Sequence, residues 1–398
     1  MATSSRDTMR AVVFKGPYAV AVEDRPIPTI QEPTDVILKV RYAGLCGSDL
    51  HFYRGHQKIP TGFIIGHEFT GTVLEVGSGN MDGIAVGDEV VVPFFTACGN
   101  CFYCERKEAS RCAKGLLFGE LSPSYFSAGA ILAAVGKTSA GTNSIDGGQA
   151  QYVRVPFAST TLIKAPASIA NEMLVLMADI FPTGFFAASR FLSGLSEEGS
   201  ASTVAVVIGC GPVGICAIVS ALTMIKTVYA IDPNPERLAE AAKLGAKVIS
   251  ADDDPVEVIK QATNGRGADV VMEVVGREDA LSTALQLVRP WGKISSVGVY
   301  AQDLNLPGPL LYGKNVTLAM GRCPVRSIFE EALMVLVREQ EKVRFLTGLF
   351  MDIEDAEEAF KVFESGKVHK VYSVSAPINL QVVGERALEH ESALKPIA

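Results

Sequence analysis

The stretch TVAVVIGCGPVG, residues 203–214, decides the fold of this 398-residue chain. Its first half is a run of β-branched and apolar residues without a charge, which is typical of a strand buried on both faces. Gly209, Gly211 and Gly214 follow at once, and an apolar segment of helical length continues after them. The stretch therefore predicts a buried strand, a tight glycine turn and a buried helix.

The same region has to be weighed against a membrane span, because no charged residue occurs between Glu198 and Lys226. Pro212 and the three glycines interrupt that interval near its centre. This punctuation favours a strand, a turn and a helix over one continuous helix. We therefore predict no association with a membrane.

Beyond residue 214, short apolar strands alternate with helices. This alternation predicts an α/β fold with a parallel, doubly wound sheet that is covered by helices on both faces. We expect its strands at residues 203–208, 227–231, 247–250, 268–275, 293–299 and 315–320. Helices are expected at residues 235–244 and 279–288, and Gly245 ends the first of them.

The segments on either side of this sheet have a different pattern. Residues 9–180 are rich in short strands separated by glycine and proline. The Ala-, Gly- and Ser-rich stretch 127–144 lies inside a connection of unusual length, and its role stays open. The final part predicts two amphipathic helices, a strand and a weakly structured tail, with these elements at residues 328–339, 355–365 and 371–375.

The composition limits the classes of protein to be considered. Hydrophobic residues make up 48% of the chain and charged residues 20%, so two or three domains with real cores are expected. There are 36 Lys and Arg against 44 Asp and Glu, and no basic cluster, so a nucleic-acid partner is not expected. The chain starts without an apolar run of signal-peptide length, and we predict a reducing, cytoplasmic location.

The glycine turn predicts a dinucleotide site. Gly209 would permit the tight turn, Gly211 the approach of a pyrophosphate, and Gly214 close packing of helix on strand. Asp232 ends the next strand and could bind the adenosine ribose, which favours NAD(H) and makes NADP(H) less expected, although Arg237 lies nearby. A glycine turn without nucleotide, with Asp232 only capping a helix, is the alternative. The expected cofactor contacts are Gly209, Gly211, Pro212, Val213, Gly214, Asp232, Arg237, Val297 and Val299.

Four of the eight cysteines fall within fifteen residues, at Cys98, Cys101, Cys104 and Cys112. Four thiolates in a short lobe predict a structural, tetrahedral Zn²⁺ site without an open position. An iron–sulfur cluster is an alternative, but the typical fourth spacing followed by proline is absent. Four thiols without a metal are the remaining possibility.

A second group of possible ligands is dispersed through GLCGSDLH at residues 44–51 and GHEFTG at residues 66–71. Together with the glycine turn and the four cysteines, these segments resemble the zinc-dependent medium-chain alcohol dehydrogenase family. The resemblance runs from about residue 9 to 375. It implies a GroES-like catalytic domain at residues 1–181 with the zinc lobe at about 95–115, a Rossmann domain at 182–322, and a return to the catalytic domain at 323–398.

The resemblance also implies a catalytic zinc, the second of two zinc ions in each chain. Cys46 and His67 match two of the family's ligands. Where the third ligand is usually a cysteine, this chain has Asp179, as in the glutathione-independent formaldehyde dehydrogenases; a helix cap is the alternative for Asp179. Glu68, next to His67, could occupy the open position transiently or orient the site.

Further catalytic and binding roles follow from the same resemblance. Ser48 and His51 would pass the proton of the substrate to solvent. Asp49 would hold the tautomer of His67 by a hydrogen bond. Phe95 matches a position that lines the substrate pocket, and Lys370 matches a basic position near the pyrophosphate.

The predicted function is hydride transfer between an alcohol, or an aldehyde or ketone in the reverse direction, and NAD(H). The formaldehyde-type dehydrogenase or dismutase and a polyol dehydrogenase are alternative enzymes, and a nucleotide-binding relative without catalysis is the alternative from another class. The expected partner is a small alcohol or aldehyde. The family also implies a homo-dimer or homo-tetramer.

Overall fold

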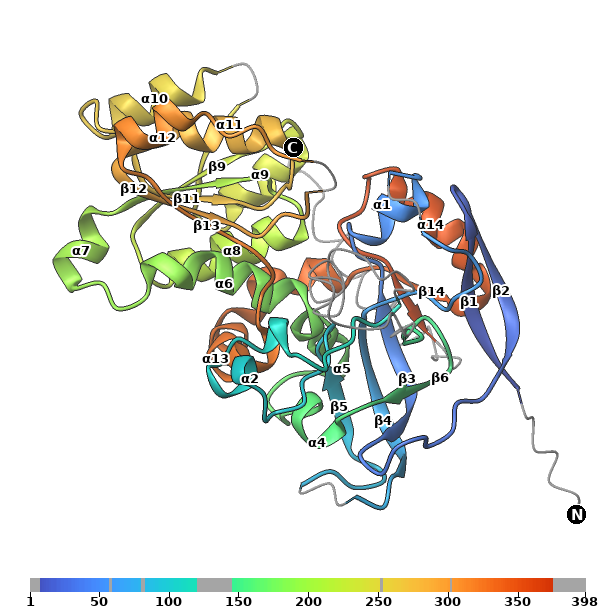
Figure 1. The fold of residues 1–398 in the computed structure, drawn as a ribbon. Coiled ribbons are helices and arrows are strands. Elements are labelled where there is room, and N and C mark those ends of the chain that lie inside the picture. Colours follow the sequence, from blue (N-terminus) through green and yellow to red (C-terminus); the bar gives the residue numbers. More distant parts are fainter. Residues whose placement is uncertain are drawn as a thin grey trace, which may run out of the picture.

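The computed structural model describes residues 8–56, 59–79, 83–119, 145–250, 253–300 and 303–374. Figure 1 shows two parts side by side, one built on a parallel sheet and the other on an antiparallel sheet. The stretch 127–144 and the expected tail lie outside the described residues. The predicted α/β class is confirmed.

The parallel sheet has six strands in the order β10-β9-β8-β11-β12-β13, which is the predicted doubly wound arrangement. All five neighbouring pairs run parallel. Its strands are β8 (Val204–Ile208), β9 (Thr227–Ile231), β10 (Lys247–Ile249), β11 (Ala268–Glu273), β12 (Val288–Ser296) and β13 (Thr317–Met320). β12 starts five residues before the expected residue 293, and the other strands start within two residues of expectation.

Helices cover both faces of this sheet, as Figure 1 shows. The alternation of side chains along β8 explains the two layers, because successive residues of a strand point to opposite faces. Ala205 and Val207 pack with α6 and α8, whereas Val206 and Ile208 pack with the α10 and α11 side. The helices of this part are α6 (Ile180–Leu192), α7 (Glu197–Ser202), α8 (Pro212–Leu222), α9 (Pro235–Lys243), α10 (Pro255–Ala262), α11 (Glu278–Leu287) and α12 (Gly308–Lys314).

The carboxyl ends of five strands form one row. Pairing places Ile231, Ile208, Glu273, Ser296 and Met320 side by side as the last residues of β9, β8, β11, β12 and β13. The loops that follow these strands therefore meet along one edge. Ligands of open α/β sheets bind at this edge, where the chain order reverses on either side of the first strand.

The antiparallel part is centred on β3, which pairs with β4, β6 and β15. Its main path is β14-β15-β3-β4-β5-β7, and β1 and β2 form a separate hairpin. Its strands are β1 (Thr8–Gly16), β2 (Ala19–Pro26), β3 (Val36–Gly44), β4 (Glu68–Val76), β5 (Glu89–Val92), β6 (Tyr152–Val155), β7 (Ile163–Lys164), β14 (Phe350–Asp352) and β15 (Tyr372–Val374). Its short helices are α1 (Asp49–Tyr53), α2 (Phe102–Glu105), η1 (Ala109–Arg111), α4 (Ala158–Thr161), α5 (Asn171–Leu174), η2 (Val175–Ala178), η3 (Arg344–Thr347) and η4 (Ile353–Asp355).

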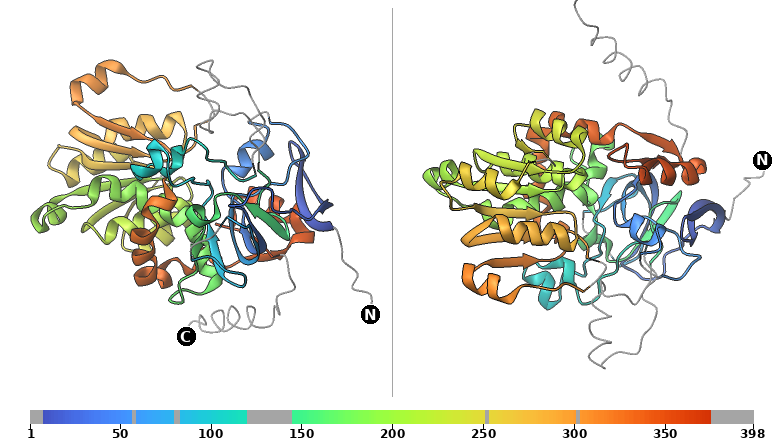
Figure 2. Two further views of the ribbon diagram at one scale, coloured as in Figure 1. Left: turned by 60° about the horizontal axis from the view of Figure 1, so that its bottom comes forward. Right: turned by 90° about the horizontal axis from the view of Figure 1, so that it is seen from above.

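The last described segment returns to this antiparallel part. β15 lies between β14 and β3, and α14 (Ala356–Glu364) packs near the β1–β2 hairpin. The views in Figure 2 place this red segment beside the blue N-terminal strands. The predicted helices at 328–339 and 355–365 and the strand at 371–375 are present as α13 (Val325–Val343), α14 and β15.

One core joins the two parts. Val91 of β5 packs in the same buried cluster as Phe181 of α6 and Ile215 of α8. The expected domain boundary at residue 181 falls inside α6, one residue after its first residue, Ile180. The division at residues 181 and 322 stays a prediction.

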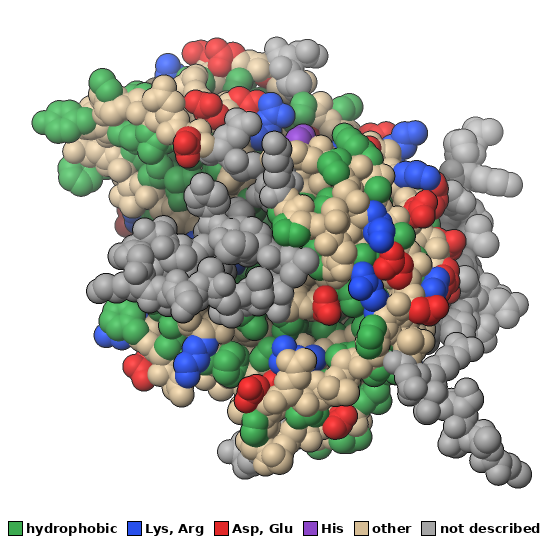
Figure 3. Space-filling model, turned by 45° about the vertical axis from the view of Figure 1, so that its right-hand side comes forward, with side chains coloured by type: hydrophobic (Ala, Val, Ile, Leu, Met, Phe, Trp, Pro, Cys, Tyr) green, Lys and Arg blue, Asp and Glu red, His purple; other side chains and the backbone are tan. Residues whose placement is uncertain are grey.

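No single helix within the described ranges is long and apolar enough to cross a membrane. The bent pair formed by residues 171–178 and Ile180–Leu192 meets the length and composition test together. The charge-free interval around Pro212 is the predicted strand, turn and helix. Figure 3 shows Lys and Arg side chains interspersed with Asp and Glu on the face in view.

Candidate active site

Three predicted metal ligands from distant parts of the chain meet. Cys46 lies in the loop before α1, His67 directly precedes β4, and Asp179 lies between η2 and α6. The sulfur of Cys46 is 3.7 Å from Oδ2 of Asp179, and Nε2 of His67 is 3.6 Å from the same oxygen. The possible ligand atoms of these residues and Glu68 all lie within 4.8 Å of one another. One ion could contact all of them.

Neighbouring side chains orient these ligands. One oxygen of Asp49 lies 3.3 Å from Nδ1 of His67, and the other accepts the backbone N–H of Cys46 at 2.8 Å. Thr183 donates its hydroxyl to Oδ1 of Asp179 at 2.7 Å. These contacts leave Nε2 of His67 and Oδ2 of Asp179 turned toward the sulfur of Cys46. Such outer partners fix the tautomer and direction of metal ligands.

The alternative in which Asp179 serves as a helix cap finds no support in its side-chain contacts. Asp179 does occupy the position before α6, with φ of −150°, but its carboxylate makes no cap hydrogen bond. It bonds the hydroxyl of Thr183 and faces His67 instead. The residue that precedes α6 thus supplies a carboxylate to the cluster, and Thr183 in the first turn of the helix orients it.

The electrostatics of the cluster favour a cation. Burial raises the pKa of the Cys46 thiol, and the charge of Glu68 raises it further. Burial alone would lower the pKa of His67, but the charges of Asp49 and Cys46 raise it well above its usual value. Burial opposes ionisation of Asp179, but contact with His67 lowers its pKa. A thiolate, an imidazole and a carboxylate suit Zn²⁺, which would supply positive charge to this buried acidic group.

Glu68 is paired with Lys370. The ammonium of Lys370 contacts Oε2 of Glu68 and donates to the backbone oxygen of Leu45 at 2.7 Å. Both side chains are buried, with Glu68 fully inaccessible. Oε1 of Glu68 has no hydrogen-bond partner among the described residues. In this structure the charge of Lys370 is engaged beside the metal ligands, and its expected role near the pyrophosphate stays a prediction.

The four cysteines of the lobe also converge. Cys98, Cys101, Cys104 and Cys112 can place their sulfur atoms within 4.8 Å of one another, and all are free thiols. The amide of Cys98 donates to the sulfur of Cys112 at 3.2 Å. Burial raises the pKa of Cys101, but backbone amides, that of Ala113 foremost, lower it to about 6. Four sulfur donors with amide support fit the predicted closed zinc site.

The glycine turn sits at the row of strand ends. Gly214 packs so closely on the backbone oxygen of Gly209 that a Cβ at Gly214 would overlap it. Pro212 and Val213 form the first turn of α8, whose unpaired amides point at the edge of the sheet. This is the strand–turn–helix geometry that a pyrophosphate requires.

Asp232 lies beside the turn. Its oxygens accept the backbone N–H groups of Cys210 at 2.7 Å and Asn234 at 2.8 Å. The side chain of Asn234, and not that of Asp232, caps α9. The capping alternative for Asp232 is therefore not what the geometry supports. The guanidinium of Arg237 would lie 3.9 Å from a Cβ at Gly211, close to the same turn.

Close packing of two helices links the metal cluster to the glycine turn. Gly184 lies on α6, five residues after Asp179, and would place a Cβ 2.7 Å from the backbone oxygen of Val213. Only glycine permits this approach of α6 to the start of α8. The carboxylate of Asp179 is consequently held near the helix that begins at the glycine turn.

The structure places Ser48, His51 and Phe95, three predicted site residues, in three different surroundings. The hydroxyl of Ser48 lies 3.2 Å from Nε2 of His67, so it reaches the metal cluster. His51 lies on α1, and burial together with the charges of His56 and Arg54 lowers its pKa. Phe95 is buried beneath the guanidinium of Arg322, with 5.4 Å between the guanidinium carbon and the ring centroid.

Sequence reasoning missed two residues of the site. The ring of Phe94, not that of Phe95, packs edge-on against His67 with centroids 6.4 Å apart. The sequence alone does not show which of the two neighbouring phenylalanines faces His67. Thr183 was also missed, although its spacing of four residues from Asp179 on a helix was a usable signal.

Comparison with known proteins agrees with this geometry. The family model described as alcohol dehydrogenase GroES-like domain matches residues 32–167, and the model described as zinc-binding dehydrogenase matches residues 212–338. Zinc-type alcohol dehydrogenase B of Aspergillus flavus is 46% identical over 372 residues, covering 92% of this chain and 82% of the relative. The glutathione-independent formaldehyde dehydrogenase of Pseudomonas aeruginosa is 31% identical, covering 90% of this chain and 95% of the relative.

Among solved structures, alcohol dehydrogenase TADH from Thermus sp. ATN1 superposes with a TM-score of 0.80 at 34% identity, covering 92% of this chain and 99% of that one. Relatives of one class therefore align with nearly the whole chain and with both of its parts. The alternative of a relative without catalysis is set aside by these matches. The chain belongs to the zinc-dependent medium-chain alcohol dehydrogenase family and is an alcohol oxidoreductase.

Proposed function

We propose that the chain transfers hydride between an alcohol, or an aldehyde or ketone in reverse, and NAD(H). The observation that carries the proposal is the convergence of Cys46, His67 and Asp179 within 4.8 Å beside the helix that begins at the glycine turn. A zinc site with three protein ligands next to a dinucleotide site is the arrangement that alcohol oxidation needs.

Cys46, His67 and Asp179 would hold the catalytic zinc, and the four cysteines of the lobe the structural one. A bound zinc ion would act as a Lewis acid on the oxygen of the substrate. Asp49, 3.3 Å from Nδ1 of His67, would keep the proton on that nitrogen and leave Nε2 free to bind the ion, and Thr183 would orient the carboxylate of Asp179 for the same purpose. The protein's contribution is a fixed set of ligands with one position open.

Ser48 and His51 would carry the proton away. The hydroxyl of Ser48 lies 3.2 Å from Nε2 of His67 and is placed to accept a proton from the substrate oxygen. The lowered pKa of His51 favours its neutral form near pH 7, and neutral His51 can accept that proton in turn. Phe94, packed against His67, would keep water from the reacting carbon.

Glu68 would remain outside the ligand set while Lys370 holds it. The pair is supported by the buried contact between them and by the second bond of Lys370 to the backbone of Leu45. Breaking this buried pair would leave one charge uncompensated, which is strongly destabilising. We infer that Lys370 positions Glu68.

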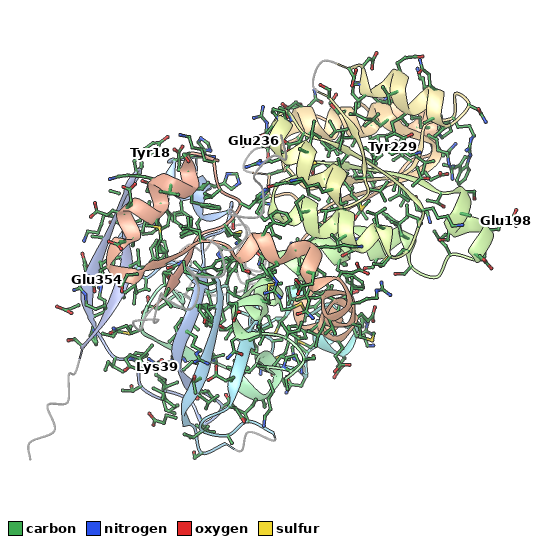
Figure 4. The ribbon with its side chains drawn as sticks, turned by 180° about the vertical axis from the view of Figure 1, so that it is seen from behind. Tyr18, Lys39, Glu198, Tyr229, Glu236 and Glu354 are labelled. Carbon is green, nitrogen blue, oxygen red and sulfur yellow. The ribbon has the colours of Figure 1, made fainter. Side chains whose placement is uncertain are left out.

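NAD(H) is favoured over NADP(H) by the charge beside the glycine turn. The buried carboxylate of Asp232 would meet the ribose hydroxyls and repel a 2′-phosphate. Glu236, labelled in Figure 4, lies in the first turn of α9, at the end of the parallel-sheet part that faces the antiparallel part. The expected contacts at Gly209, Gly211, Pro212, Val213, Gly214, Arg237, Val297 and Val299 belong to the same proposal.

A formaldehyde-type dehydrogenase or dismutase is the second candidate, because Asp179 stands at the ligand position as the formaldehyde dehydrogenase resemblance implies. Assays with formaldehyde and with longer alcohols, followed by the absorbance of the reduced nicotinamide, would distinguish the two. Sustained turnover of longer alcohols with added NAD supports the first candidate. Formaldehyde turnover with cofactor retained through gel filtration supports the second.

We propose a homo-oligomer that forms through the edge of the parallel sheet. Within the described residues, the outer edge of β13 pairs with no strand. Large apolar side chains are exposed on β12, β13 and the segment between them, namely Trp291, Leu306, Tyr312 and Met320. An open apolar edge invites pairing with a second copy. Light scattering would decide between a dimer and a tetramer, and a monomer would contradict the proposal.

The cytoplasmic location stays a prediction, supported by eight free cysteines. The experiment that tests the proposed function is metal analysis together with a screen of alcohols and aldehydes against NAD(H) and NADP(H). We expect two zinc ions per chain and turnover with NAD(H). One zinc per chain, removable without loss of turnover, would contradict the catalytic site.

A further inference from the structure

Glu273 is a fully buried carboxylate that the proposed reaction does not use. It is the last residue of β11 and lies in the row of strand ends between Ile208 and Ser296. None of the ion pairs in the described part of the chain includes Glu273. Its burial without such a pair requires another explanation, because an unsatisfied buried carboxylate is costly.

Four donors satisfy this carboxylate. Oε1 accepts the backbone N–H groups of Val275 and Gly276, each at 2.7 Å. Oε2 accepts the hydroxyls of Ser296 at 2.7 Å and Tyr300 at 2.6 Å. Burial and the contact with Glu273 raise the pKa of Tyr300, which keeps its hydroxyl a donor. One side chain thus joins the loop after β11 to the loop after β12.

These two loops form one wall beside the glycine turn. A Cβ at Gly298 would overlap the backbone nitrogen of Gly276, so the loops touch through their backbones. A methyl group of Val275 lies 2.7 Å from where a Cβ at Gly209 would stand. Val275 is 39% exposed although it is apolar, so the wall presents a hydrophobic surface next to Gly209 of the glycine turn.

The loops after β11 and β12 lie where the nicotinamide half of the cofactor is expected. Asp232, expected at the adenosine ribose, follows β9, which is next to β8 on one side. β11 and β12 lie on the other side of β8. A dinucleotide spans the point where the strand order reverses, so its second half lies over these two strands.

We propose that Glu273 and Tyr300 are positioning residues that hold the two loops in the arrangement that receives the nicotinamide half of NAD(H). The inference rests on the proposed function. Without the hydrogen bonds of Glu273 to both loops, the loops would have to become ordered when the cofactor binds. The cost of that ordering would lower the affinity of the enzyme for the cofactor. Neither residue touches the metal cluster, so the effect should be specific to the cofactor.

Tyr300→Phe tests the inference, because it removes one hydroxyl and keeps the ring. Losing one such hydrogen bond should raise the NADH dissociation constant about two- to tenfold, and the KM for NAD with it. Zinc content and the KM for the alcohol should stay unchanged. Tyr152→Phe, at a similarly half-buried tyrosine on β6, is the matched control and should leave NADH binding unchanged.

Fluorescence titration of the zinc-loaded enzyme with NADH gives the decisive comparison. If the wild-type chain binds NADH and Tyr300→Phe binds it equally well, the inference is overturned while the proposed function stands. If Tyr300→Phe weakens NADH binding and also loses zinc or alcohol affinity, the residue acts on general stability and the inference is overturned as well. If the wild-type chain fails to bind NADH, the proposed function fails and the inference fails with it.

Discussion

The carboxylate of Asp179 lies 3.6 Å from Nε2 of His67, while its other oxygen accepts the hydroxyl of Thr183 at 2.7 Å. The carboxylate therefore has one oxygen for the protein and one for the metal. The direction of a carboxylate ligand decides how well it binds, so a hydroxyl outside the ligand set should influence the metal.

Thr183→Val should weaken binding of the catalytic zinc. The change keeps the shape of the side chain and removes the only donor to Oδ1 of Asp179 among the described residues. We expect zinc affinity to fall by about 10- to 100-fold, measured by competition with a chelator. Thr183→Ser restores the hydroxyl and should restore affinity. Equal zinc affinity in the valine variant would show that Thr183 does not orient the ligand.

Asp179→Ala should remove one zinc ion from each chain and abolish turnover, while NADH still binds. The reason is that Cys46 and His67 alone leave too few protein ligands for a catalytic zinc site. Metal analysis and cofactor titration on the same sample measure both effects. Asp35→Ala, at a buried carboxylate outside both clusters, is the control for loss of a buried polar group. Full turnover of Asp179→Ala would refute the ligand assignment.

Asp232→Ala should relax the preference for NAD. Without this carboxylate, the ribose loses its acceptor and a 2′-phosphate is no longer repelled. We expect the ratio of kcat/KM for NAD over NADP to fall by about tenfold or more, an energy near 1.4 kcal/mol. Asp254→Ala removes the cap of the nearby helix α10 and serves as the control. An unchanged ratio in Asp232→Ala would place the preference elsewhere.

Protonation of His51 should destabilise the folded chain at low pH. Burial and the positive charges of His56 and Arg54 lower the pKa of His51 below its ordinary value of 6.5. The unfolded chain therefore binds this proton more readily, so stability is lost as pH falls below that ordinary value. His51→Gln cannot take up the proton and should lose less of its free energy of unfolding between pH 7 and pH 5, as urea titration would measure. An identical loss in both proteins would refute this assignment.

The same group predicts the pH dependence of alcohol oxidation. If neutral His51 accepts the proton, turnover should fall as pH drops through its lowered pKa. His51→Gln should lower turnover at neutral pH and flatten this acidic limb of the profile. A limb that persists unchanged in the variant would assign it to another group.

The alternation of strands and helices in residues 203–320 was readable from sequence, because strands buried on both faces are continuous apolar runs. The start of β12 could not be read from the sequence, because Arg289, Pro290 and Trp291 interrupt its hydrophobic pattern. In the structure, Val288 already pairs with Ala268. Ladder pairing with a neighbouring strand extends that element, and local pattern does not record it.

The residues of the candidate site also divide into those that the sequence predicted and those that it did not. The four clustered cysteines were predictable from residue type and spacing, whereas Cys46 and His67 were predictable only through the family resemblance. The partner of Lys370 was not predictable, since it depends on β15 lying beside β3. The hydrogen bonds of Glu273 were missed for a similar reason. A carboxylate at the end of a strand gives no sign of the hydroxyls of Ser296 and Tyr300 that donate to it.

The place of β15 has a consequence for how the enzyme acquires its metals. The four cysteines of the lobe lie within one short segment, so a chain still being synthesised already contains that complete ligand set. Glu68 instead depends on Lys370, which lies just before β15 and is synthesised long after the four cysteines. We therefore expect the lobe to be able to bind its metal earlier in synthesis than the proposed catalytic site, which needs Lys370 in place.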